Sequence, residues 1–151
     1  MQNDGPIRVP PDVMATSVTD LPWAWLHQLC GSIRTLSRGW GLSENLLRKK
    51  DKTDEIPLYI ISEIVYRMDR FIEKAEDAEG FNNIAELYTS WQNFYTDSGM
   101  GEKRARILAT RGDMPNPKDE LMLLRAKKCK VADLKQCRLH FFQKLNKELG
   151  K

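Results

Sequence analysis

The sequence predicts an all-α protein folded as a single domain of about five to six helices. Apolar residues recur every three or four positions over long stretches, as they do along one face of a helix. No segment shows the alternation typical of a β-strand, and no internal repeat is visible. A chain of 151 residues, 41% of them hydrophobic, is long enough to bury one core.

Residues 1–19 are expected to form a flexible, disordered arm, because three prolines oppose helix there and no apolar period emerges. The helical domain is expected to occupy residues 20–150. Asp20 is a favourable N-cap for a first helix, which Gly31 and Ser32 can split in two. The apolar stripe of this segment is Trp25, Leu26, Leu29, Ile33, Leu36 and Trp40.

The clearest helical pattern lies in residues 57–76, and Pro57 suits a first helical turn. Its apolar positions are Leu58, Ile61, Ile64, Val65, Met68, Phe71 and Ile72. Polar residues take the opposite face, so we expect a core helix against which the other helices pack.

Residues 83–112 are expected to form an aromatic helix followed by a short basic one. The first runs over residues 83–96, with Asn83 and Glu86 three apart as a capping box. Its apolar face carries Ile84, Leu87, Tyr88, Trp91, Phe94 and Tyr95. Such a stripe can stack nucleic-acid bases, but helical spacing of large apolar residues favours a role in the core. The basic helix ends at Gly112.

A long basic helix is expected over residues 117–149, with Asn116 as its cap and Pro117 as its first residue. No Gly or Pro interrupts it, so it is one long helix or a pair with a bend near Lys130. Its expected apolar face is Leu121, Leu124, Val131, Leu134, Phe141, Leu145 and Leu149. A continuous helix of this length outruns a small globule, so its exposed part is expected to bind a partner.

The charge of the chain is divided unevenly. Residues 1–100 hold 10 Lys and Arg against 15 Asp and Glu, a net charge of −5. Residues 101–151 hold 14 against 6, a net charge of +8. A basic C-terminal third favours an anionic partner, although a solvated lysine-rich helix face has the same composition.

Residues 32–50, SIRTLSRGWGLSENLLRKK, resemble the helix-turn-helix of lambda-repressor-like phage and plasmid regulators. Ser37 stands at the small packing position and Gly41 at the turn. The bracketing apolar residues are Leu36, Trp40, Leu42 and Leu47, while Gly39 inside the first helix departs from the pattern.

The resemblance implies a helix-turn-helix core within residues 20–76 and a recognition helix over residues 43–50. The side chains that it places in the major groove are Ser43, Glu44, Asn45 and Arg48. It places Lys49 and Lys50 near phosphates, with Lys50 at a position that is usually apolar.

Two pairs of side chains have the spacing of metal half-sites. His27 and Cys30 stand three apart, as do Cys137 and His140, so each pair shares one helix face. If the first and last helices are neighbours, these four residues can form a tetrahedral zinc site. The alternative is that the cysteines are small buried hydrophobes, and we expect no cofactor.

The chain carries no recognisable catalytic motif, so we do not expect an enzyme. No apolar run is long enough to span a membrane, and no secretory signal is visible, which predicts a cytoplasmic protein. The sequence-based hypothesis is a DNA-binding regulator or packaging factor of phage or mobile-element type, with duplex DNA as partner. The alternative is a non-catalytic adaptor or scaffold that binds itself or another protein through residues 117–149.

Overall fold

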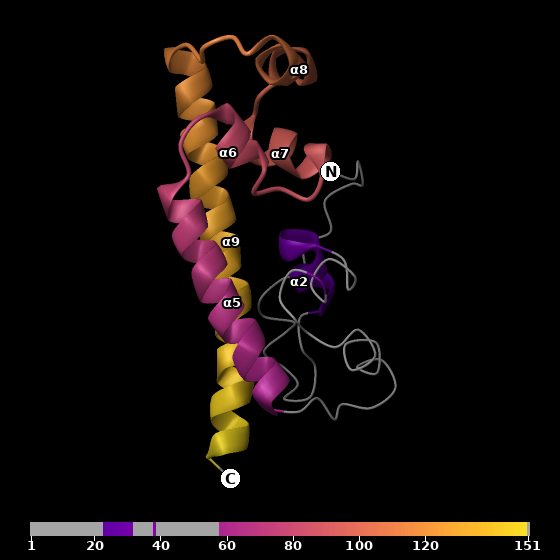
Figure 1. The fold of residues 1–151 in the computed structure, drawn as a ribbon, viewed down its shortest axis with the longest axis vertical. Helices are drawn as coiled ribbons and strands as arrows, with labels where there is room; N and C mark the ends of the chain where they lie inside the picture. The colour runs from indigo at the N-terminus through magenta and orange to yellow at the C-terminus, as the bar shows by residue number, and fades with distance from the viewer. Residues whose placement is uncertain (1–22, 32–37, 39–57, 151) are drawn as a thin grey trace.

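The computed structural model describes residues 23–31, 38 and 58–150 (Figure 1). The helices in these ranges are α2 (Trp23–Cys30), α5 (Leu58–Asp77), α6 (Phe81–Ala85), α7 (Trp91–Ser98), α8 (Glu102–Arg111) and α9 (Pro117–Leu149). The described part of the chain contains no β-strand, so the predicted all-α class is confirmed. None of its helices is long and apolar enough to cross a lipid bilayer.

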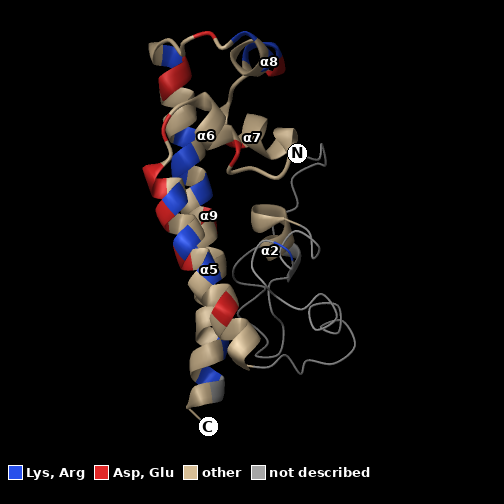
Figure 2. Ribbon diagram, viewed as in Figure 1, with Lys and Arg blue, Asp and Glu red and all other residues tan. Residues whose placement is uncertain are grey.

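α5 and α9 form an antiparallel pair that carries the core. Asp69 of α5 pairs with Arg138 of α9 at 2.9 Å, and Glu76 lies 3.9 Å from Lys135. The residue numbers of the α9 partners fall as those of α5 rise, as an antiparallel arrangement requires. Lys and Arg residues recur along the middle of α9 (Figure 2). The expected core role of α5 is confirmed by its buried residues, Ile60, Ile61, Ile64, Val65, Met68, Ile72 and Ala75.

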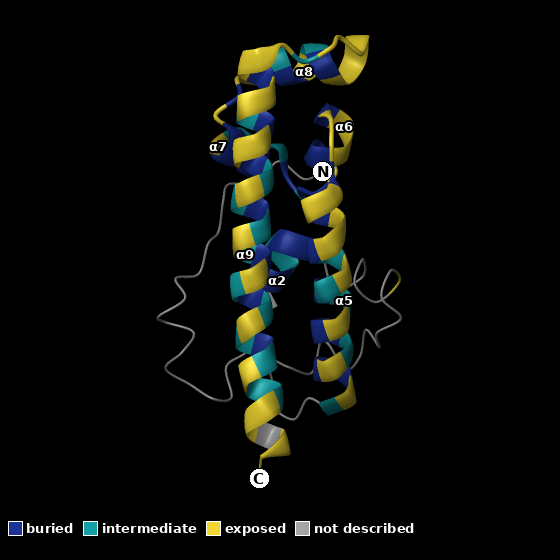
Figure 3. Cartoon of the chain, turned by 90° about the vertical axis from the view of Figure 1, so that its left-hand side faces the viewer, coloured by how far each residue is buried: buried dark blue, intermediate teal, exposed yellow. Residues whose placement is uncertain are grey.

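α9 is one uninterrupted helix of 33 residues, about 50 Å long at 1.5 Å per residue. The alternative of two helices bent near Lys130 is therefore wrong. Exposed and buried segments alternate along α9 (Figure 3). Its buried stripe recurs every three or four residues and consists of Leu123, Ala126, Lys130, Leu134, Cys137 and Phe141.

α2 packs against the middle of α9. Its side chains Trp25, Leu26 and Leu29 are buried, as the apolar stripe predicted. The ammonium group of Lys130 donates a hydrogen bond of 2.6 Å to the carbonyl oxygen of Leu29. The helix ends at Cys30 and is followed by Gly31, whose φ of 119° suits glycine.

The helix predicted over residues 83–96 is wrong, because the chain forms two helices there, α6 and α7. Ser90 has an extended backbone, and its hydroxyl accepts a hydrogen bond from the Asn93 N–H, which starts α7. Between the two helices the Tyr88 hydroxyl lies 2.9 Å from an Asp97 carboxylate oxygen and 2.7 Å from the Ala126 carbonyl oxygen. Burial of this tyrosine against α9 overrides the local helical period.

The capping box expected from Asn83 and Glu86 is also wrong. α6 begins after Gly80, which has a φ of 83° and supplies no side-chain cap. The Asn83 amide instead donates to the carbonyl oxygen of Glu79 at 2.9 Å. The expected role of the aromatic stripe in the core is confirmed, because Tyr88 and Phe94 are buried.

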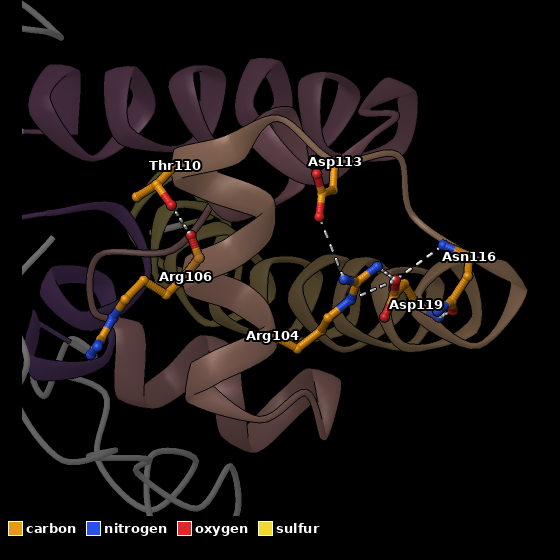
Figure 4. Close-up of polar contacts among 6 residues, drawn as sticks. All are labelled: Arg104, Arg106, Thr110, Asp113, Asn116 and Asp119. Carbon is orange, nitrogen blue, oxygen red and sulfur yellow. Dashed lines mark hydrogen bonds and ion pairs between the residues drawn. The ribbon is translucent and has the colours of Figure 1, made fainter.

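A polar corner fixes the start of α9 against α8 (Figure 4). Asn116 and Asp119 form a reciprocal capping box, with the Asp119 N–H 2.8 Å from the Asn116 side-chain oxygen and the Asn116 N–H 3.0 Å from the Asp119 carboxylate. The Arg104 guanidinium of α8 donates two hydrogen bonds, of 3.0 and 2.6 Å, to the same carboxylate oxygen. The predicted cap at Asn116 and first residue at Pro117 are confirmed.

Candidate binding surface

The candidate site is the outer face of α9, which turns away from the core. The prediction that seven apolar residues of α9 share one face is wrong: Leu121, Leu124, Val131, Leu134, Phe141, Leu145 and Leu149. Leu134 and Phe141 are fully buried, whereas the side chains of Leu121 and Leu124 are 69% and 43% exposed. Leu121 lies two residues before the buried Leu123 and Leu124 one residue after it, so the two exposed leucines point out of phase with the core.

An open groove runs along this face, with a volume of about 400 Å³. Its lining residues come from α9 and from the last turn of α5: Glu76, Leu124, Lys127, Lys128, Val131, Ala132 and Lys135. The α9 members recur at helical spacing, so they form one continuous strip. Leu124, Val131 and Ala132 are the apolar members of this strip.

The groove is positively charged. Three lysines and one glutamate line it, which gives a net charge of +2. Lys135 and Glu76 are 3.9 Å apart, and both side chains are at least half exposed, so their attraction is weak. Within the described ranges, no ion pair involves Lys127 or Lys128. Two cations are therefore free to interact with a partner.

Lys130 is buried in the core, unlike the lysines that line the groove, and the sequence did not distinguish it from them. Its side chain is only 2% exposed, and its ammonium lies 5.0 Å from the centre of the Tyr88 ring and 5.8 Å from that of Phe71. These distances are typical of cation–π contacts. Its position in the helical period could have identified Lys130 as buried, since it lies four residues from both Ala126 and Leu134 of the buried stripe.

The two His–Cys pairs are brought to one interface, because α2 and α9 are neighbours. The rings of Trp25 and His140 have centroids 6.2 Å apart, and Cys30 and Cys137 are both buried. The His27 Nδ1 atom lies 3.2 Å from the carbonyl oxygen of Gly31. Among the described residues, which include all four, no group of three or more His, Cys, Asp or Glu side chains could hold a metal ion.

Burial disfavours the reactive thiolate form of the two cysteines of this interface. It raises the pKa of Cys30 to about 12, although the nearby Lys130 acts in the opposite direction. Burial also raises the pKa of Cys137, and it lowers the pKa of His140. At neutral pH both thiols are protonated, and the geometry is that of packing side chains.

The predicted DNA-contacting residues lie outside the described ranges: Ser43, Glu44, Asn45, Arg48, Lys49 and Lys50. Of the helix-turn-helix segment, only Arg38 is described, and it is exposed. The predicted arm, residues 1–19, is also outside the described ranges. The helix-turn-helix and its contacts therefore stay predictions.

No family model, no curated protein and no solved structure matches this chain. The chemistry of the groove and the exposed residues around it therefore carry the functional inference.

Proposed function

We propose that this protein is a non-catalytic helical adaptor that binds another protein through the outer face of α9. The observation that carries the proposal is the exposure of Leu121 and Leu124 on a helix whose opposite face is anchored in the core. Exposed leucines on a rigid helix have an unfavourable contact with water, which a docked apolar surface removes. Helix-in-groove recognition uses this kind of surface.

The composition of the surface favours a protein partner over a purely electrostatic one. Contacts to phosphates require cations, and the apolar floor formed by Leu124, Val131 and Ala132 adds nothing to them. A protein surface can cover that floor and pair with the surrounding lysines together. The three cysteines of the chain are all free, which supports an intracellular, reducing location for the complex.

The test is capture of a partner by tagged full-length protein from the cells that produce it. The variant Leu121→Glu with Leu124→Glu places charges on the outer face of α9. The matched control, Tyr59→Glu with Tyr66→Glu, changes two exposed apolar residues of α5 instead. We expect the α9 variant to lose the captured protein and the α5 variant to keep it.

Two results would reject the adaptor proposal. One is equal capture by both variants, which would show that the outer face of α9 plays no part. The other is a monomer by light scattering that captures nothing in any form. Circular dichroism of both variants must first show unchanged helix content.

A second proposal is duplex DNA binding by a small regulator or packaging factor. It is supported by the exposed cations Lys118, Arg125 and Lys128 of α9, together with the predicted contacts at Arg48 and Lys49. Fluorescence anisotropy with a labelled duplex tests it. We expect affinity to fall steeply as salt rises, and the double variant Arg48→Ala with Lys49→Ala to weaken it. Binding no tighter than that of an unrelated basic protein would reject this proposal.

A further inference from the structure

We propose that the groove beside α9 binds an acidic amphipathic helix of the partner protein. This inference rests on the proposed adaptor function and specifies the chemistry of its partner. The groove supplies what such a helix needs, namely an apolar strip and unpaired cations beside it.

The apolar strip has the spacing of a helix–helix interface. Leu124 and Val131 of the groove stand seven residues apart, and the exposed Leu121, which does not line the groove, stands three residues before Leu124. One helix presents this pattern to another over three turns. Ala132 follows Val131 and is exposed in the groove, where its small side chain permits a close approach. A partner helix lying along α9 can place its own apolar residues between these positions.

The charges select the partner and orient it. Lys127 and Lys128 have no ion-pair partner in the described ranges, and Lys135 is only loosely paired. A carboxylate on the flank of the partner that lies over α9 can reach these ammonium groups. On the other side of the groove stands Glu76, with Glu73 exposed one turn earlier on α5. The acidic flank must therefore lie over α9, and a neutral or basic flank over α5.

The same charges disfavour the other occupants. A second copy bound about a twofold axis would present the same patch to itself, so that two grooves of net charge +2 would face each other. A nucleic-acid backbone would match the lysines but would leave Leu121 and Leu124 against phosphates. An acidic helix satisfies both the apolar and the charged residues.

The probe is a synthetic amphipathic peptide of about three heptads with leucines on one face, glutamates on one flank and glutamines on the other. A second peptide carries lysines in place of the glutamates. Binding of each to the full-length protein is measured by isothermal titration calorimetry. We expect the acidic peptide to bind at least about tenfold more tightly than the basic one, because it can form about three exposed ion pairs of modest strength.

Variants of the groove make the test specific. Lys127→Glu with Lys128→Glu should reverse the preference between the two peptides, and Leu124→Ala should weaken the binding of both. The matched control, Lys103→Glu with Lys147→Glu, makes the same change of charge at exposed lysines outside the groove and should change neither affinity. Helix content of each variant is checked by circular dichroism.

Three results would overturn the inference. The first is equal affinity for the two peptides. The second is that duplex DNA displaces the acidic peptide and that this displacement depends on Lys127 and Lys128. The third is that light scattering shows a dimer which Leu124→Glu dissociates. If these occur while the variant at Leu121 and Leu124 still loses its captured protein, the adaptor function stands and only the acidic partner is rejected. If that variant captures normally, the adaptor function itself fails.

Discussion

Asp119 offers the sharpest test of how α9 is held in place. Its side chain is 3% exposed and accepts hydrogen bonds from the Asn116 N–H and from two nitrogens of Arg104. It also lies in the first turn of α9, where a negative charge interacts favourably with the helix dipole. Replacing it by alanine removes all of these interactions together.

The expected loss of stability follows from those contacts. Hydrogen bonds to a charged group contribute about 1.5–3 kcal/mol, and the interaction with the helix dipole adds about 0.3–1 kcal/mol. The Arg104 side chain is 33% exposed, which weakens its share. We therefore expect Asp119→Ala to lower the free energy of unfolding by about 2–3 kcal/mol. Asp119→Asn keeps an acceptor oxygen and should cost about half as much.

Equilibrium unfolding in urea measures these losses, and an unchanged denaturant slope would show that only the native state is affected. Asn116→Ala removes the other half of the capping box and should cost about 1 kcal/mol. A cost below about 0.5 kcal/mol for Asp119→Ala, comparable to an ordinary surface substitution, would refute the assigned role of this corner.

The same carboxylate predicts a dependence on pH. The hydrogen bond from Arg104, and after it the one from the Asn116 N–H, lower the pKa of Asp119 below its ordinary value, while burial acts in the opposite direction. A pKa that is lower in the folded than in the unfolded state stabilises the protein above the unfolded pKa. This contribution is lost as the pH falls through the folded pKa. The stability difference between wild type and Asp119→Asn should therefore shrink as the pH falls below the ordinary aspartate pKa and through the lowered folded pKa, and a difference that grows would contradict the assignment.

Three further predictions concern the core, a turn and the thiols. Lys130→Ala should lower the free energy of unfolding in urea by about 2–5 kcal/mol more than Lys130→Met, because only methionine retains a buried unbranched side chain. Equal losses for the two variants would refute the packing role of Lys130. Gly99 has a φ of 75°, so Gly99→Ala should lower the free energy of unfolding by about 1–2 kcal/mol. Gly101 has a φ of −71°, so Gly101→Ala should lower it by less, and the reverse order would contradict this reasoning. Cys129 is half-buried, whereas Cys30 has a pKa raised to about 12 by burial. Alkylation followed by mass spectrometry should therefore modify Cys129 first, and faster modification of Cys30 would count against the α2–α9 packing.

Local signals were sufficient to predict several elements of the fold. Each of these signals acts within a few residues of the feature that it specifies. They are the apolar period of α5, the cap at Asn116 and the glycine that follows α8. The division between α6 and α7 was not predictable in this way. It depends on Tyr88, whose hydroxyl reaches an oxygen of Ala126, 38 residues away in the sequence.

The candidate site illustrates the same limit. Leu121, Leu124, Leu134 and Phe141 all fit a spacing of three or four residues, so periodicity alone joins them into one face. Their separation into a buried and an exposed set depends on where α5 and α2 contact α9. The basic composition of the C-terminal third was visible in the sequence. The sequence did not show that Lys130 faces the core while Lys127 and Lys128 line a groove.

The central claim, that α9 presents a protein-binding face, is tested most directly by a photo-crosslinking scan along this helix in the full-length protein. A photoreactive residue is placed in turn at each exposed or half-buried position of residues 120–139 and irradiated with the partner present. The adaptor proposal predicts cross-linking yields that rise and fall with the helical period, highest at positions 121, 124, 128 and 131. Yields that are uniform around α9, or highest on its side away from the groove, would contradict it.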